Sequence, residues 1–106
     1  MRQSRSYPNN PMSDKQPCIY ILTSGRNGTL YVGVTSNLAK RIDEHRRSTD
    51  GFTAKYKVHT LVYAEQCDSM EQAITREKQI KGGSRKKKLE LIEGINPHWK
   101  DLSDWV

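Results

Sequence analysis

The sequence has no long apolar run. No segment approaches the ~18 consecutive apolar residues that a membrane-spanning helix needs. Arg2 and Arg5 stand near the start, but no apolar stretch follows them, so a secretory signal is not expected either. We therefore expect a protein that does not span a membrane and that resides in the cytoplasm.

Cysteine is also scarce. Cys18 and Cys67 each lie inside an apolar run, where a free thiol behaves as a small hydrophobic side chain. Neither belongs to a CxxC pair of the kind that binds zinc or carries out redox chemistry. The sequence therefore does not predict a structural zinc site.

Acidic residues are outnumbered by basic ones. The 106 residues include 18 Lys and Arg against 12 Asp and Glu, a formal net charge of +6. A chain of this length forms one domain with one modest core. An excess of positive charge is expected of proteins that approach nucleic acids, but many basic proteins bind none, so charge alone does not decide the function.

Residues 1–17 contain Pro8, Pro11 and Pro17 among polar residues, with little to bury, which predicts a disordered arm. The folded domain is expected to span residues 18–106. Within it, β-branched and aromatic runs predict strands, and N-cap residues followed by helical spacing predict helices. The strands are predicted at 18–23, 30–34 and 59–65, and the helices at 37–47, 69–82 and 84–94. The order β-β-α-β-α-α implies an α+β fold, a small sheet with helices packed on it.

Glu77 interrupts the apolar side of the second predicted helix. The apolar residues of that side are Met70, Ala73, Ile74 and Ile80. A charged carboxylate facing the core is costly without a partner, so we expect Glu77 to meet an Arg, a Lys or a metal ion. The alternative is an ordinary surface pair with Lys81, worth only about 0.3–0.5 kcal/mol. Position alone favours neither.

Two basic clusters, on the first and third predicted helices, could contact a phosphate backbone. Cations in the first turn of the third helix oppose the helix dipole, and bound phosphates would offset this cost. The alternative is a solvated charge run. If both helices face the same way, they form a groove for a phosphate chain. The candidate contact residues are Arg46, Arg47, Lys81, Arg85, Lys86, Lys87 and Lys88.

Tyr20 and Tyr31 lie on consecutive predicted strands joined by a hairpin loop. Their side chains can therefore emerge on one face of the sheet. Gly33 marks a bend or a place where another group comes close. Taken singly, strand tyrosines are often half-buried core residues, and His45 would be read as a surface histidine.

Together these residues resemble the GIY-YIG nuclease family, over residues 18 to about 99. The segment 18–20, Cys-Ile-Tyr, stands where the first triplet belongs, and 31–33, Tyr-Val-Gly, stands for the second. Arg41 follows Tyr31 by ten positions and His45 comes one helical turn later, both at the family's spacing. Glu77 matches the family's metal-binding glutamate. The resemblance implies a three-stranded antiparallel sheet flanked by helices, and it is strongest to the short bacterial stand-alone members.

The sequence departs from the family pattern at four positions. Cys18 replaces the first Gly, and Val32 replaces the usual Ile; both contribute backbone and packing. Gly83 lies where the small members usually carry Trp. Asn96 could stand for the family's late active-site Asn, although it follows Glu77 at a longer distance than expected.

The resemblance implies metal-dependent phosphodiester hydrolysis by the five residues Tyr20, Tyr31, Arg41, His45 and Glu77. Glu77 would hold one Mg²⁺ or Mn²⁺, and Arg41 would pair with the phosphate. Tyr20, with its pKa lowered by the cation and the arginine, would take a proton from water that Tyr31 orients. His45 is the competing base.

DNA is the expected substrate, and repair, recombination and mobile-element processing are all compatible settings. We expect a monomer or a weak dimer. One alternative is a non-catalytic nucleic-acid-binding module with the same fold, which would bind in a salt-sensitive manner without cleaving. Another is a basic protein-interaction domain with no affinity for polyanions.

Overall fold

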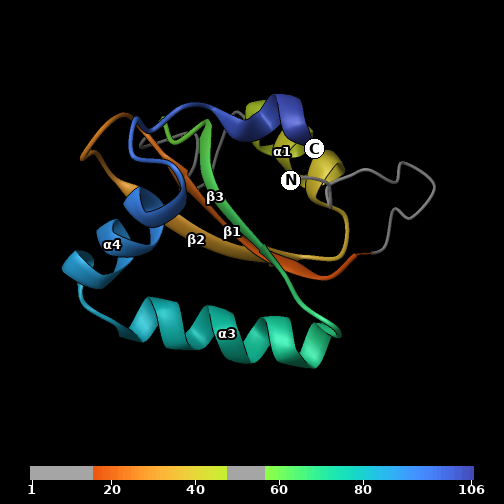
Figure 1. The fold of residues 1–106 in the computed structure, drawn as a ribbon. Coiled ribbons are helices and arrows are strands. Elements are labelled where there is room, and N and C mark those ends of the chain that lie inside the picture. The colour runs from red at the N-terminus through yellow and green to blue at the C-terminus, as the bar shows by residue number, and fades with distance from the viewer. Residues whose placement is uncertain (1–15, 48–56) are drawn as a thin grey trace.

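The computed structural model describes residues 16–47 and 57–106. The elements in this part of the chain follow the predicted order, β-β-α-β-α-α, with a short 3-10 helix added at the end (Figure 1). They are β1 (Cys18–Thr23), β2 (Leu30–Thr35), α1 (Leu38–Arg47), β3 (Thr60–Gln66), α3 (Met70–Gly82), α4 (Arg85–Ile95) and η1 (Leu102–Trp105). Within the described residues, no helix has both the length and the apolar character needed to cross a bilayer.

The three strands form one antiparallel sheet in the order β2-β1-β3. β1 is the central strand, and all six of its residues are buried. In its pairing with β2, Tyr20 lies opposite Gly33 and Leu22 lies opposite Tyr31. The expected three-stranded antiparallel sheet is therefore confirmed, and its register places the two tyrosines as diagonal neighbours on one face.

Helices cover both faces of this sheet. Successive side chains of β1 point to opposite faces, as they do in any strand. Ile19 and Ile21 pack into the core shared with α3 and α4, whereas Tyr20 and Leu22 pack into the core shared with α1. Figure 1 shows α3 and α4 on one side of the sheet and α1 with η1 on the other. The structure therefore has two thin cores, separated by a fully buried central strand.

The helices begin where the sequence predicts. The Ser69 hydroxyl accepts a hydrogen bond from the Gln72 backbone N–H at 3.1 Å, and the Ser84 hydroxyl accepts one from Lys87 N–H at 3.2 Å. Asn37 caps α1 in the same way, through its side-chain oxygen. Such N-caps satisfy backbone donors that would otherwise have no partner.

The predicted N-terminal arm lies mostly outside the described residues. Gln16 and Pro17, its last two residues, are described and are attached to the end of the sheet. Gln16 Nε2 donates to the Cys67 carbonyl at 3.0 Å, and Cys67 N–H donates to the Pro17 carbonyl at 2.8 Å. The folded part of the chain therefore includes these two residues.

Candidate active site

Tyr20 stands at the centre of the candidate site, on the α1 side of β1. Its ring is fully buried and lies against the backbone of Gly33, its partner across the β1–β2 pair. A Cβ at position 33 would be 2.9 Å from Tyr20 Cε1, and closer still to Cζ and Oη. Of the two roles foreseen for Gly33, the structure shows the close approach. Glycine is needed here because the phenol occupies the place of a side chain.

His45 approaches Tyr20 from α1. Leu38 and Ile42, one turn apart, bury the inner side of this helix against the sheet. His45 Nε2 consequently lies 2.9 Å from the Tyr20 hydroxyl oxygen, at hydrogen-bonding distance. When the imidazole is neutral and Nδ1 carries the proton, Nε2 accepts the phenol O–H.

Tyr31 completes an aromatic cluster with these two residues. Its ring centroid lies 6.3 Å from that of Tyr20 and 5.2 Å from that of His45. The Tyr20 and His45 centroids are 5.8 Å apart. Tilted and edge-on contacts of this kind are favourable for aromatic rings, so three residues from three elements hold one another in place.

Arg41 borders the cluster, one helical turn before His45. Its Nε donates to Tyr20 Oη over 3.4 Å, a long hydrogen bond, and its Nη1 is 3.3 Å from the Glu44 carboxylate. The Arg41 side chain remains 45% exposed. Part of the guanidinium is therefore available at the surface, beside a buried phenol.

Burial sets the protonation of Tyr20. Removal from solvent raises the pKa of its hydroxyl to about 12, and the hydrogen bond from Arg41 lowers that pKa only in part. Arg41 lowers the pKa of Tyr20, as expected, but among the protein's own groups the desolvation of the phenolate outweighs the guanidinium. Tyr20 is a neutral phenol at pH 7 unless its proton is taken by a neighbour.

The pKa of His45 is shifted in the opposite direction. Burial lowers it from 6.5, and the positive charge of Arg41 lowers it further, with a smaller contribution from His59. The Glu44 carboxylate opposes these effects. The imidazole is therefore neutral at pH 7, which is the form that can accept a proton.

Glu77 lies on α3, in the layer on the other side of the sheet. Its side chain is only 15% exposed, and Oε2 is 3.1 Å from Nζ of Lys81, whose side chain is 53% exposed. The Lys81 pair is thus formed, but with a carboxylate more buried than in an ordinary surface pair. α3 also packs against β2, the edge strand that carries Tyr31.

The apolar side of α3 is narrower than predicted. Ala73 and Ile80 are buried, whereas Met70 and Ile74 are exposed. The sheet contacts a limited strip of this helix, so the outer two residues of the predicted stripe face solvent.

Glu77 is the residue here that could hold a divalent cation. No cluster of three or more His, Cys, Asp or Glu residues exists among the described residues. A single carboxylate that already binds one cation suits Mg²⁺ or Mn²⁺, because such ions take one or two carboxylates and complete their coordination with water and phosphate oxygens. The donor set therefore fits one hard cation and does not fit an all-protein metal cage.

Asn96 is not part of the cluster. Its side chain is buried; Nδ2 donates to the carbonyls of Val62 at 3.1 Å and Lys100 at 2.8 Å, and Oδ1 accepts from Lys100 N–H at 2.9 Å. Val62 belongs to β3, the sheet edge opposite to β2. The amide groups of Asn96 tie the segment after α4 to the sheet, so the structure assigns it a structural position, away from Tyr31.

Three of the predicted phosphate-contacting residues bind other parts of the protein. Arg46 Nη2 is 2.7 Å from Asp101 and 2.8 Å from the Ser103 hydroxyl. Arg85 Nη2 donates to the carbonyls of Asn27 at 2.8 Å and Gly28 at 2.7 Å, in the β1–β2 loop. Lys88 Nζ donates to the Gly83 carbonyl at 2.9 Å. These three cations therefore form contacts between different segments of the protein.

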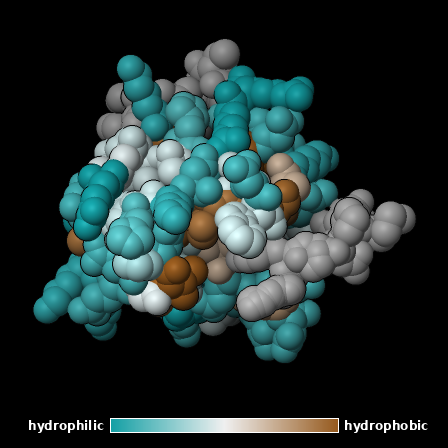
Figure 2. Space-filling model, turned by 45° about the horizontal axis from the view of Figure 1, so that its top comes forward, coloured by the Kyte–Doolittle hydropathy of each residue, from teal (hydrophilic) through white to brown (hydrophobic). Residues whose placement is uncertain are grey.

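The remaining basic residues are exposed. Arg47 forms a solvent-exposed pair with Asp43 at 3.1 Å, and Lys81 is bound to Glu77. Lys86 and Lys87 are exposed at the start of α4. Because α1 and α4 pack on opposite faces of the sheet, the predicted groove shared by the two helices does not form. The surface on the side of α1 and η1 is largely hydrophilic, with small apolar areas (Figure 2).

One positioning contact was not foreseen from the sequence. Asp101 binds Arg46 of α1, the backbone N–H of Leu61 at 3.3 Å and that of Ser103 at 3.0 Å. This links η1 to β3 and to the turn of α1 that carries His45. The spacing Asp-x-Ser is typical of a turn in which the carboxylate accepts a backbone N–H. This spacing was the feature of the sequence that could have predicted the role of Asp101.

Comparison with known proteins agrees with this geometry. The family model described as the GIY-YIG catalytic domain matches residues 16–90. A UPF0213 protein of Desulfotalea psychrophila is 35% identical over 85 residues, covering 78% of this chain and 77% of that protein. A UPF0213 protein of Staphylococcus saprophyticus is 42% identical over 78 residues, covering 70% of this chain and 90% of its own.

A solved structure has the same fold. The solution NMR structure of a UPF0213 protein from Bacillus halodurans matches with a TM-score of 0.50 and 26% identity, covering 81% of this chain and 92% of that chain. The family model spans well over half of the sequence and includes every residue of the aromatic cluster. This chain belongs to the GIY-YIG family of nuclease domains, among its short UPF0213 members.

Proposed function

We propose that this protein is a metal-dependent endonuclease that hydrolyses phosphodiester bonds in DNA, in repair or recombination. The observation that carries the proposal is the 2.9 Å contact between a neutral phenol and a neutral imidazole, beside a partly exposed guanidinium. Phosphodiester hydrolysis needs an activated water and positive charge at the phosphoryl oxygens. The cluster can provide both.

Glu77 is the residue that would hold Mg²⁺ or Mn²⁺. When bound, such an ion supplies positive charge to the phosphoryl oxygens and polarises water. Lys81 must then leave the carboxylate, and its flexible side chain is free to turn toward a phosphate. Arg41 would contact a phosphate, because the outer part of its guanidinium reaches the surface.

Tyr20 and His45 would act as one base. In this step a water molecule gives a proton to Tyr20 Oη while the phenol proton passes to His45 Nε2, and the resulting hydroxide attacks phosphorus. The P–O bond to the leaving group breaks, and that oxygen takes a proton from solvent. This assignment follows from the two pKa shifts, because Tyr20 alone keeps its proton at pH 7 and His45 is ready to accept it.

Tyr31 would orient the attacking water and the imidazole. Its ring lies 5.2 Å from that of His45, edge to face, which limits the rotation of the imidazole. Loss of the ring would therefore loosen the Tyr20–His45 contact without removing either group.

Cleavage assays with three substrates test the proposal. The full chain is incubated with plasmid, single-stranded DNA and RNA in the presence of Mg²⁺, Mn²⁺ or a chelator. We expect cut DNA with a divalent cation and none with chelator, and we expect Glu77→Ala to lose cleavage while it retains DNA binding. Salt-sensitive mobility shifts without products under every condition would instead identify a non-catalytic nucleic-acid-binding module.

A further inference from the structure

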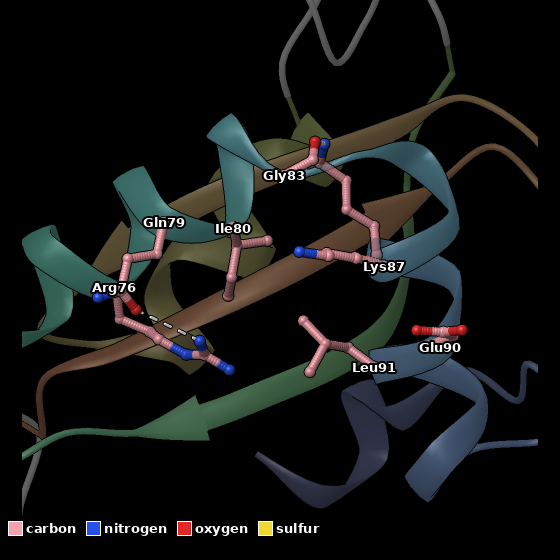
Figure 3. A pocket seen from close by; sticks show the side chains of 8 residues that line it. Arg76, Gln79, Ile80, Gly83, Lys87, Glu90 and Leu91 are labelled. Carbon is pink, nitrogen blue, oxygen red and sulfur yellow. Dashed lines mark hydrogen bonds between the residues drawn. The ribbon is translucent and has the colours of Figure 1, made fainter.

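A hollow of about 370 Å³ lies between α3 and α4 (Figure 3). It is on the sheet face opposite to Tyr20, because α3 and α4 pack into the other core. Its volume falls in the lower part of the range of small-molecule pockets, roughly 300–1,000 Å³. The residues that line it are Arg76, Gln79, Ile80, Gly83, Lys87, Lys88, Glu90 and Leu91.

The hollow combines apolar and cationic walls. Ile80 and Leu91 contribute apolar side chains from the two helices, and in Figure 3 both point into the space between them. The guanidinium of Arg76 and the ammonium of Lys87 enter the same space from opposite sides (Figure 3). A ligand seated there would meet both apolar surface and positive charge.

Two of the lining cations are fixed by the protein. Arg76 Nε is 3.0 Å from the Glu65 carboxylate, and its Nη1 donates to Gln79 Oε1 at 3.4 Å, which orients the guanidinium. Lys88 Nζ is bound to the Gly83 carbonyl. Groups that are already held in place lose little conformational freedom when a ligand binds.

Among the cations that line the hollow, Lys87 is the one whose placement the fold does not explain. Arg85 holds the β1–β2 loop and Lys88 holds the turn before α4, whereas Lys87 is exposed and its ammonium has no hydrogen-bond or ion-pair partner among the described residues. Positive charge in the first turn of a helix opposes the helix dipole. An anion bound at this end of α4 would offset that cost.

We propose that the α3–α4 hollow is a binding site for a small phosphomonoester with an apolar body, such as a nucleoside monophosphate. The lining holds three cations and one carboxylate, Glu90, and Glu65 pairs with Arg76 from outside the lining. The charge that remains is positive, which suits a phosphate that carries nearly two negative charges at pH 7. Arg76 and Lys87 bind the phosphate, while Ile80 and Leu91 contact the base. The site is separate from the proposed cleavage centre and does not depend on it.

Titration with AMP by ¹⁵N–¹H NMR, without divalent metal, tests this site on the full chain. AMP contains no phosphodiester bond, so the outcome is independent of nuclease activity. We expect saturable shifts of backbone amides at residues 79–83 and 87–91, with little change at Tyr20 and His45. Adenosine and inorganic phosphate, titrated separately, should each bind at least about tenfold more weakly than AMP.

Two neighbouring lysines provide matched variants. Lys87→Gln should weaken AMP binding about tenfold, as expected for the loss of a charged hydrogen bond. Lys86→Gln removes the same charge one residue earlier, outside the lining, and should change the affinity by less than about twofold. An equal loss in both variants, equal affinity for inorganic phosphate, or shifts centred on Tyr20 would each overturn the proposal.

Discussion

Replacing Gly33 with alanine should either destabilise the protein or displace the Tyr20 ring. The new Cβ would lie 2.9 Å from Tyr20 Cε1 and closer to Cζ and Oη, and the ring cannot retreat easily because it is fully buried among neighbouring side chains. Overpacking of this kind costs about 1–3 kcal/mol. Alanine also restricts the unfolded chain and so recovers about 0.4–1 kcal/mol, which leaves a net loss of stability of up to about 2.6 kcal/mol.

Urea unfolding measures this loss, and thermal unfolding measures it independently. A domain of this size changes its melting temperature by about 4–8 °C for each kcal/mol. Gly94→Ala is the control, because a Cβ at Gly94, on α4, would meet nothing within 4 Å. This helical substitution should be neutral or stabilising, by up to about 1 kcal/mol.

A double-mutant cycle isolates the cause. In a Tyr20→Ala background the ring is absent, so Gly33→Ala should cost almost nothing further. A full-sized loss in that background would mean that the backbone of β2, not the phenol, requires glycine. Unchanged stability and unchanged activity of Gly33→Ala in the native background would refute the close approach itself.

Three further predictions concern charge. Lys81→Met removes the cation that is paired with Glu77 and should tighten Mn²⁺ binding about two- to fivefold, the scale of a partly exposed ion pair. Electron paramagnetic resonance of free Mn²⁺ measures the affinity. The control is Lys78→Met, at an exposed position of the same helix, which should have no effect. Because the folded protein lowers the pKa of His45 below 6.5, its unfolded state binds more protons. The contribution of His45 to the free energy of unfolding is therefore complete above pH 6.5 and is lost as the pH falls through the pKa of the folded state. Over this pH range, the free energy of unfolding of His45→Gln, measured in urea, should depend less on pH than that of the native protein. Asp101→Asn weakens a half-exposed pair with Arg46 and should lower stability by up to about 1 kcal/mol, with faster hydrogen exchange at the Leu61 amide as the readout.

Local patterns were sufficient to predict the elements. Ser69 and Ser84 begin helices because their hydroxyls accept backbone N–H groups of the first turn, and this chemistry is visible in the sequence. All six residues of β1 are buried because helices cover both faces of the sheet. The 3-10 helix η1 was not predicted, since it depends on Arg46 and Leu61, more than 30 residues away in the chain.

The proximity of Tyr20 and Tyr31 was foreseen because the pairing of two consecutive strands is regular, whereas the proximity of Arg41 and His45 to them was implied by the resemblance to the GIY-YIG family. Their protonation was not foreseen, because it depends on how deeply the fold buries Tyr20, and burial is a tertiary property. The spacing of residues likewise did not predict that α1 and α4 pack on opposite faces of the sheet. A helix pattern identifies which side is buried, but not which face of the sheet it covers.

Single-turnover cleavage of end-labelled DNA by the native protein and by Tyr20→Phe, in the presence of Mg²⁺, tests the central assignment most directly. Phenylalanine keeps the ring against Gly33 and removes only the hydroxyl that contacts His45. We predict the same DNA affinity and a cleavage rate lower by at least about a hundredfold, as for loss of general base catalysis. Equal cleavage rates for the two proteins would contradict the account.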